Sequence, residues 1–211
     1  RKFMPSRHEA KLAEAKSRKI DLVMIGDSIT HNWESERNYE QTFKHANLLN
    51  LGFAGDRTKN VLWRIQHGAL DGIEPKLVTL MIGTNHAHLP KRGYAPDTPE
   101  DVIAGIRAIL TEIRTRLPEA KILVFSIFPR RAGQESEVVA AVNAMLPQLA
   151  DGTTIVHKDI NAAFLDEEGK QRTELYNRDL LHLNSKGYER WAAVLLPLLK
   201  EYGVTQSESE E

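Results

Sequence analysis

In the stretch "LVMIGDSITHNW", Leu22–Trp33, a continuous apolar run ends at a glycine, and a polar segment then begins with Asp27 and Ser28. A short apolar run without alternation is typical of a parallel strand that is buried on both faces. Such a strand would deliver Ser28 at its carboxyl end, where a hydroxyl either caps the next helix or attacks a substrate. The remainder of the chain has to decide between these two interpretations.

Four further apolar runs have the same character, and three of them end at a glycine or a proline. Helical patterns with one apolar face lie between them. This alternation predicts right-handed βαβ units, and therefore a parallel sheet covered by helices on both sides. The expected fold class is α/β, a three-layer α/β/α sandwich. The four runs are Asn47–Gly52, Lys76–Gly83, Lys121–Pro129 and Thr153–Ile160.

Several segments between and around these runs are predicted to be helical. In one of them Thr98 is the expected N-cap, and Pro99 takes the first helical position, where proline is favoured. Pro147 should bend or end another, and Trp191 lies on the apolar face of the last. The predicted helices are Ser6–Lys19, Thr58–Gly68, Thr98–Leu117, Ser136–Ala150 and Ser185–Tyr202.

The chain is predicted to hold one domain, residues 20–202, between a lead-in helix in residues 1–19 and a disordered tail in residues 203–211. Leu12 gives the lead-in helix little to bury, so this helix is expected to be mostly solvated. The tail is polar and acidic, which is typical of disorder. The first residue is not a methionine, so a secreted or periplasmic protein whose signal has been removed is one reading, and the compartment stays open.

The composition of the chain bears on which partners and which kinds of chemical site can be expected. The chain of 211 residues has a formal net charge of −1, which gives no electrostatic reason to expect a nucleic acid or a membrane as partner. No apolar run approaches the length of a membrane span. The chain contains no cysteine, which excludes disulfides, thiolate catalysis and cysteine-based zinc sites.

Ligands of parallel α/β sheets bind beyond the carboxyl ends of the strands, so the polar residues at those ends are the candidates for function. They come from four separate segments of the chain. They are Ser28 after the first strand, Gly52, Gly55 and Asp56 after the second, Asn85 and His86 after the third, and Asp179, His182 and Asn184 before the last helix.

A serine hydroxyl needs a base to take its proton and a third group to orient that base. Asp179 and His182 lie three residues apart in one loop and would supply an oriented imidazole to Ser28. The oxyanion of an ester's tetrahedral intermediate needs N–H donors, for which the candidates are the backbone of Ser28, the backbone of Gly52 and the side chain of Asn85. Each residue alone also reads as a cap, a turn former or a structural histidine. Their joint occurrence at one edge favours catalysis.

The segments "GDS", "LGFAGD", "GTNH" and "DLLH" resemble the four consensus blocks of the SGNH hydrolases, the GDSL family of esterases and lipases. The resemblance covers Ile20–Leu199. It places the serine, glycine, asparagine and histidine of the family name, and the family's acid, at Ser28, Gly52, Asn85, His182 and Asp179.

Within that family, the region around "NLGFAGDRTKNVLWRIQHGAL" is similar to platelet-activating-factor acetylhydrolase subunits and to bacterial carbohydrate acetylesterases. The resemblance implies a flavodoxin-like sheet of five parallel strands and removal of a short acyl group from a small-molecule or carbohydrate ester. It implies no metal and no other cofactor, and it suggests a homodimer without establishing one.

The sequence departs from the family pattern at several positions. His86 stands where this subgroup often has a second asparagine, and it would contact either the substrate or a loop. Trp33 would wall an acyl pocket or stack on a sugar, with ordinary packing as the alternative. Arg130 and Arg131 are expected in a solvated loop rather than against a leaving group.

His86 and His88 have no nearby carboxylate and make a poor zinc site.

The hypothesis is a serine esterase that hydrolyses short-chain, mainly acetyl, esters through an acyl-enzyme, with a carbohydrate O-acetyl ester as the first expectation. A platelet-activating-factor-type acetylhydrolase and a thioesterase are the alternatives, because the same groups would serve. The non-enzymatic alternative is a flavodoxin-like binding module in which Ser28, Asn85 and His182 are idle.

Overall fold

Five parallel strands form one sheet in the order β2-β1-β3-β4-β5, in a computed structural model that describes residues 5–87 and 97–205. This strand order is that of flavodoxin-like sheets, so the predicted fold class is confirmed. The strands are β1 (Leu22–Gly26), β2 (Leu48–Gly52), β3 (Leu77–Met81), β4 (Lys121–Phe125) and β5 (Ile155–Lys158).

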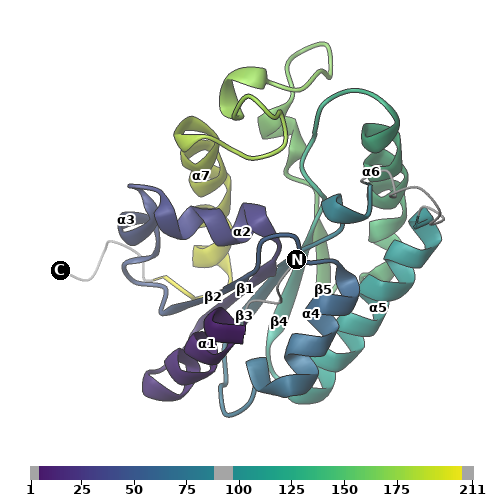
Figure 1. The fold of residues 1–211 in the computed structure, drawn as a ribbon. Helices are drawn as coiled ribbons and strands as arrows, with labels where there is room; N and C mark the ends of the chain where they lie inside the picture. The colour runs from purple at the N-terminus through teal and green to yellow at the C-terminus, as the bar shows by residue number, and fades with distance from the viewer. Residues whose placement is uncertain (1–4, 88–96, 206–211) are drawn as a thin grey trace.

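Helices cover both faces of the sheet, which makes three layers (Figure 1). Alternate residues of each strand point to opposite faces: Val23 of β1 joins the core beneath α4, α5 and α6, whereas Met24 joins the core beneath α3 and α7. The α-helices are α1 (Pro5–Ser17), α2 (Ser28–Asn32), α3 (Tyr39–Phe43), α4 (Thr58–Arg64), α5 (Pro99–Arg116), α6 (Gln134–Met145) and α7 (Ser185–Glu201).

The helix signals in the sequence act as predicted. Thr98 caps α5, its side chain accepts the N–H of Asp101, and Pro99 takes the first turn. α6 ends at Met145 and continues as a 3₁₀ turn that contains Pro147. In α7, Trp191 is 1% exposed and packs against the sheet.

Most described residues of the lead-in helix are exposed or partly exposed, as expected, but the helix also docks on the sheet. α1 buries His8 and Ala15, and its polar side chains contact the edge strand β2 rather than solvent alone. These contacts are polar, so they leave no apolar stripe in the sequence to predict them. At the other end the predicted disordered tail, residues 203–211, starts too early: the N–H groups of Gly203 and Val204 bond to α7, and Val204 is 5% exposed in the core. Residues 206–211 of that tail lie outside the described residues.

No helix within residues 5–87 and 97–205 combines the length and the apolar character needed to cross a membrane.

The register of the sheet brings the predicted site together. Gly26 at the end of β1 pairs with Gly52 on one side and with Met81 on the other. The loops that follow β1, β2 and β3 therefore leave the sheet at the same level. Ser28 begins the helix that follows β1, and Asn85 lies in the turn that follows β3, each a few residues beyond the strand end.

Candidate active site

Ser28 begins α2 directly beyond β1, and the cap of that helix is its neighbour Asp27, whose carboxylate accepts the N–H of Ile29 at 3.0 Å. The turn from strand to helix is tight, because a Cβ added to Gly26 would lie 2.1 Å from the Oγ1 of Thr30. Since Asp27 caps the helix, the hydroxyl of Ser28 is free for another partner.

That partner is His182. The Oγ of Ser28 lies 2.9 Å from Nε2 of His182, and Nδ1 of His182 lies 2.6 Å from Oδ2 of Asp179. The second oxygen of Asp179 accepts the backbone N–H groups of Leu181 and His182, both at 3.0 Å. Burial disfavours the charged carboxylate, but the hydrogen bonds from His182 and from the backbone outweigh it and lower the pKa of Asp179. The structure therefore joins the three predicted residues in one chain of hydrogen bonds.

The loop that carries Asp179 and His182 is held by its own backbone. Tyr176 and Leu183 form an antiparallel bridge, and the N–H of Asn177 donates to the carbonyl of His182 at 2.8 Å. Leu180 adopts a φ of 52°, a left-handed conformation that non-glycine residues rarely take. Its carbonyl accepts from the N–H of Arg131 at 3.0 Å. Strained backbone of this kind persists where surrounding contacts fix it.

Asn85 lies in a short 3₁₀ turn beyond β3 and is 7% exposed. Its Nδ2 donates to the backbone carbonyl of Asp56 at 2.9 Å. An amide nitrogen carries two N–H bonds, so the second is available to a ligand. The contact also ties the turn after β3 to the loop after β2.

Gly52 does not fit its predicted role as an oxyanion donor. Its N–H donates to Oδ1 of Asn50 at 2.8 Å. The N–H of the next residue, Phe53, donates to Gly26 of β1, so the N–H of Gly52 points to the outer edge of the sheet. The reason for glycine is steric instead, since an added Cβ would lie 2.3 Å from the backbone nitrogen of His31 in α2.

In the loop after β2, the N–H groups of Ala54 and Gly55 have no acceptor among the described residues, and Gly55 is the one directly beside Asp56. It has a φ of 80° in a turn that the bond from Asp56 N–H to the Phe53 carbonyl closes at 3.1 Å. Sequence reasoning treated Gly55 as a turn former only. The two glycines differ in their position relative to β2. Within an edge strand, the backbone N–H groups point alternately to the neighbouring strand and to the outer edge, and Gly52 is the last residue of the strand. Gly55 lies beyond the strand, so its N–H is not bound to this alternation.

Trp33 packs in the core, in agreement with the ordinary-packing alternative. Its side chain is fully buried and stacks on Trp191 with 4.4 Å between ring centroids. Its Nε1 donates to Asn38 at 3.1 Å. Trp33 therefore neither walls an acyl pocket nor stacks on a sugar.

His86 bonds to loops rather than pointing toward a substrate. Its Nε2 accepts the N–H of Thr58 at 3.0 Å, and its Nδ1 lies 2.9 Å from Asp97. Burial lowers the pKa of His86, although Asp97 opposes the shift. A metal pair of His86 and His88 found no support in the sequence for want of a nearby carboxylate; the structure does place Asp97 against His86, while His88 lies outside the described residues. Within the described ranges no group of three or more histidine or acidic residues is arranged to hold a metal ion.

The two arginines after β4 differ from each other. Arg130 is buried and donates to the carbonyl and hydroxyl of Thr84 at 2.8 and 3.0 Å, and it pairs with Glu135. The expectation of a solvated loop is therefore wrong for Arg130, which ties the turn after β3 to α6. Arg131 is exposed, as expected. Asn184 caps α7 through the N–H of Gly187.

Asp27 makes the stability of the protein depend on pH. Burial raises the pKa of this carboxyl to about 7, although the hydrogen bond from Ile29 opposes the shift. The native state therefore holds a proton that the unfolded chain releases near pH 4. By linkage, this stabilisation is complete below pH about 4 and is lost as the pH rises to about 7.

Asp27→Asn keeps the acceptor for Ile29 and removes the titration. Its melting temperature minus that of the wild type should rise between pH about 4 and about 7 and stay constant above. Asp159→Asn is the matched control, because exposed Asp159 makes the same contact with the N–H two residues on, at 2.9 Å. A difference for Asp27→Asn that does not change with pH would contradict the assignment.

Comparison of the sequence with known proteins shows the family to which the chain belongs. The sequence profile of the GDSL-like lipase/acylhydrolase family matches residues 24–190. The chain is 30% identical over 205 residues to the platelet-activating factor acetylhydrolase IB subunit alpha2 of Rattus norvegicus, covering 93% of this chain and 83% of that protein.

Two solved structures share the fold. A GDSL-like lipase from Bacteroides thetaiotaomicron superposes with a TM-score of 0.71 at 19% identity, covering 93% of this chain and 97% of that one. A carbohydrate esterase family 3 protein from Talaromyces cellulolyticus superposes with a TM-score of 0.67 at 18% identity, covering 89% and 100%.

The fold and the matched profile define an ester hydrolase of the SGNH type. The chain belongs to the GDSL-like lipase/acylhydrolase family, as its four sequence blocks predicted.

Proposed function

We propose that the protein is a serine esterase that works through an acyl-enzyme. The observation that supports this most directly is the chain of hydrogen bonds from Ser28 through His182 to Asp179. In the proposed reaction, Nε2 of His182 takes the proton of Ser28 while Oγ attacks the ester carbonyl, and the imidazolium then protonates the leaving alcohol. Water attacks the acyl-enzyme with His182 again as the base. Asp179 accepts a hydrogen bond from Nδ1–H, which orients the ring and stabilises the imidazolium.

The proposed oxyanion donors are the backbone N–H of Ser28, the second Nδ2 proton of Asn85 and the backbone N–H of Gly55. Gly55 replaces Gly52, whose N–H is bonded to Asn50. The support for Gly55 is its place beside Asp56, whose carbonyl receives the first proton of the Asn85 amide. Donors fixed by the fold need no reorganisation when the negative charge develops.

The proposed substrates are short-chain esters, with an acetyl group on a carbohydrate as the first choice. The names of two similar proteins, an acetylhydrolase and a carbohydrate esterase, support this class. A phospholipid-type acetyl ester is the second candidate, because the acetylhydrolase relative is 30% identical. Trp33 gives no support for a sugar site, since it is buried in the core.

The test is hydrolysis of p-nitrophenyl acetate, butyrate and octanoate, followed by acetate release from acetylated xylan and from an acetylated ether phospholipid. We expect kcat/KM to fall by at least about tenfold from acetate to octanoate, and acetylated xylan to release acetate. Preference for octanoate would overturn the short-chain class. Failure to hydrolyse any ester, together with no labelling of Ser28 by a fluorophosphonate, would overturn the esterase mechanism.

A further inference from the structure

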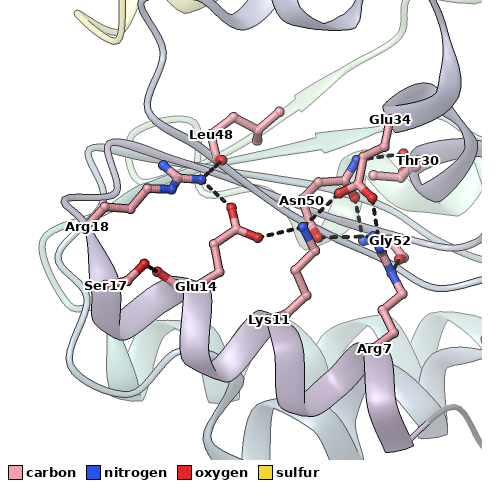
Figure 2. Close-up of polar contacts among 10 residues, drawn as sticks. All are labelled: Arg7, Lys11, Glu14, Ser17, Arg18, Thr30, Glu34, Leu48, Asn50 and Gly52. Carbon is pink, nitrogen blue, oxygen red and sulfur yellow. Dashed lines mark hydrogen bonds and ion pairs between the residues drawn. The ribbon is translucent and has the colours of Figure 1, made fainter.

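The outer edge of β2 is covered by α1 through arginine side chains. β2 is an edge strand, so alternate carbonyls face away from β1. Arg7 donates to two of these, Gly52 at 3.0 Å and Asn50 at 3.4 Å, and Arg18 donates to a third, Leu48. Figure 2 shows the two arginines at opposite ends of α1, each reaching the strand.

Arg7 contacts the segment that continues the Ser28 helix directly, whereas Arg18 is linked to it indirectly, through Glu14 and Lys11. Arg7 also pairs with Glu34 at 2.7 Å, and Lys11 pairs with Glu34 at 2.8 Å (Figure 2). Glu34 lies in the 3₁₀ turn η1 (Trp33–Ser35), which continues α2 without a break. These side chains are largely shielded from solvent, with exposures of 14%, 11% and 23% for Arg7, Lys11 and Glu34. Burial opposes ionisation of Glu34, but the two cations outweigh it and lower its pKa.

A second contact holds α2 from the same side. Nδ2 of Asn50 donates to the carbonyl of Thr30 in α2 at 2.8 Å, while Oδ1 of Asn50 accepts the N–H of Gly52. The backbone of His31 packs so closely on Gly52 that a Cβ there would lie 2.3 Å away. The part of β2 that Arg7 contacts, Asn50 and Gly52, is therefore the part that packs against α2.

We propose that Arg7, Glu34 and Asn50, here called the α1 brace, are positioning residues that hold α2 and so fix Ser28 against His182. The consequence for catalysis rests on the proposed function. Small displacements of a reacting group cost large factors in rate, so loosening the brace should lower kcat rather than raise KM. The lead-in helix then supports the reaction by holding α2 in place.

Arg7→Ala tests the brace, with Arg18→Ala as its matched control. Arg18 makes the same kind of contact with a β2 carbonyl, but it lies at the far end of the strand and makes no direct contact with Glu34 or Asn50. Its partner Glu14 also pairs with Lys11, which still holds Glu34 when Arg18 is removed. We expect Arg7→Ala to lower kcat for p-nitrophenyl acetate about tenfold with KM within about twofold. Its α2 amides at Thr30 and His31 should exchange with deuterium faster. Arg18→Ala should leave kcat and both exchange rates unchanged.

Glu34→Gln provides a second route to the same result, because it keeps the side-chain size and removes the charge that Arg7 and Lys11 share. It should lower kcat in the same way as Arg7→Ala, and Arg7→Lys should recover part of the loss. Equal kcat values and equal exchange rates in Arg7→Ala and Arg18→Ala would overturn the brace. If the wild type hydrolyses no ester, the proposed function fails, and the exchange rates alone decide whether the brace holds α2.

Discussion

Ser28→Ala is expected to lower turnover of p-nitrophenyl acetate by about 10⁴–10⁶-fold, because the proposed reaction has no other nucleophile. The fold should survive, since the side chain of Asp27, not that of Ser28, caps α2. The measurement is kcat together with the melting temperature and fluorophosphonate labelling, which should disappear in the variant.

The chain offers a matched control in Ser126. Its Oγ lies 3.0 Å from Nε2 of His157, a contact close in length to that of Ser28 with His182. Ser126 is also buried, at 1% exposure. No carboxylate contacts Nδ1 of His157 within the described residues, so this pair lacks the third member. Ser126→Ala should keep full turnover. Turnover that persists in Ser28→Ala and falls in Ser126→Ala would move the nucleophile to the other serine.

Asp179→Asn has the second largest expected effect, about 10⁴-fold in kcat. The amide oxygen of asparagine can still accept the N–H groups of Leu181 and His182, so the loop should keep its shape. The amide nitrogen would then face Nδ1 of His182 and force the proton onto Nε2. An imidazole in that tautomer cannot accept the proton of Ser28. KM should change little, because Asp179 is not placed against the substrate in the proposed reaction.

Asp166→Asn is the control for this change. Asp166 also accepts two backbone N–H groups in a loop, from Glu168 at 3.0 Å and Lys170 at 2.8 Å, and it contacts no imidazole among the described residues. Its replacement should leave kcat unchanged. If Asp179→Asn retains more than about a tenth of the wild-type kcat, orientation of His182 by Asp179 is not required.

Elements that depend on local signals were predictable from the sequence. The continuous apolar runs indicated strands because a strand buried on both faces needs no polar residues. Thr98 and Pro99 marked the start of α5 for reasons confined to one helical turn. The meeting of Ser28 with Asp179 and His182 also followed, because parallel strands bring the loops at their carboxyl ends to one edge.

Features that depend on direction or on distant polar contacts were not predictable. Gly52 lies in one of the four sequence segments that resemble the family blocks. Its N–H nevertheless points to the outer edge of the sheet, because N–H groups alternate in direction along the edge strand, and it donates to Asn50. Trp33 follows Ser28 closely, yet its side chain stacks on Trp191, more than a hundred residues further along the chain. α1 has little apolar surface, and its docking uses charged groups on backbone carbonyls, a partner that leaves no mark in the side-chain pattern.

The contact of α1 with β2 also bears on self-association. An open row of backbone groups at the side of a sheet is a template on which another polypeptide can add a strand and begin an aggregate. Here the carbonyls of Leu48, Asn50 and Gly52 already accept guanidinium protons, and the amide of Gly52 is taken by Asn50. An incoming chain would find these groups already bonded, so we expect removal of the first helix to leave the side of the sheet open to strand addition.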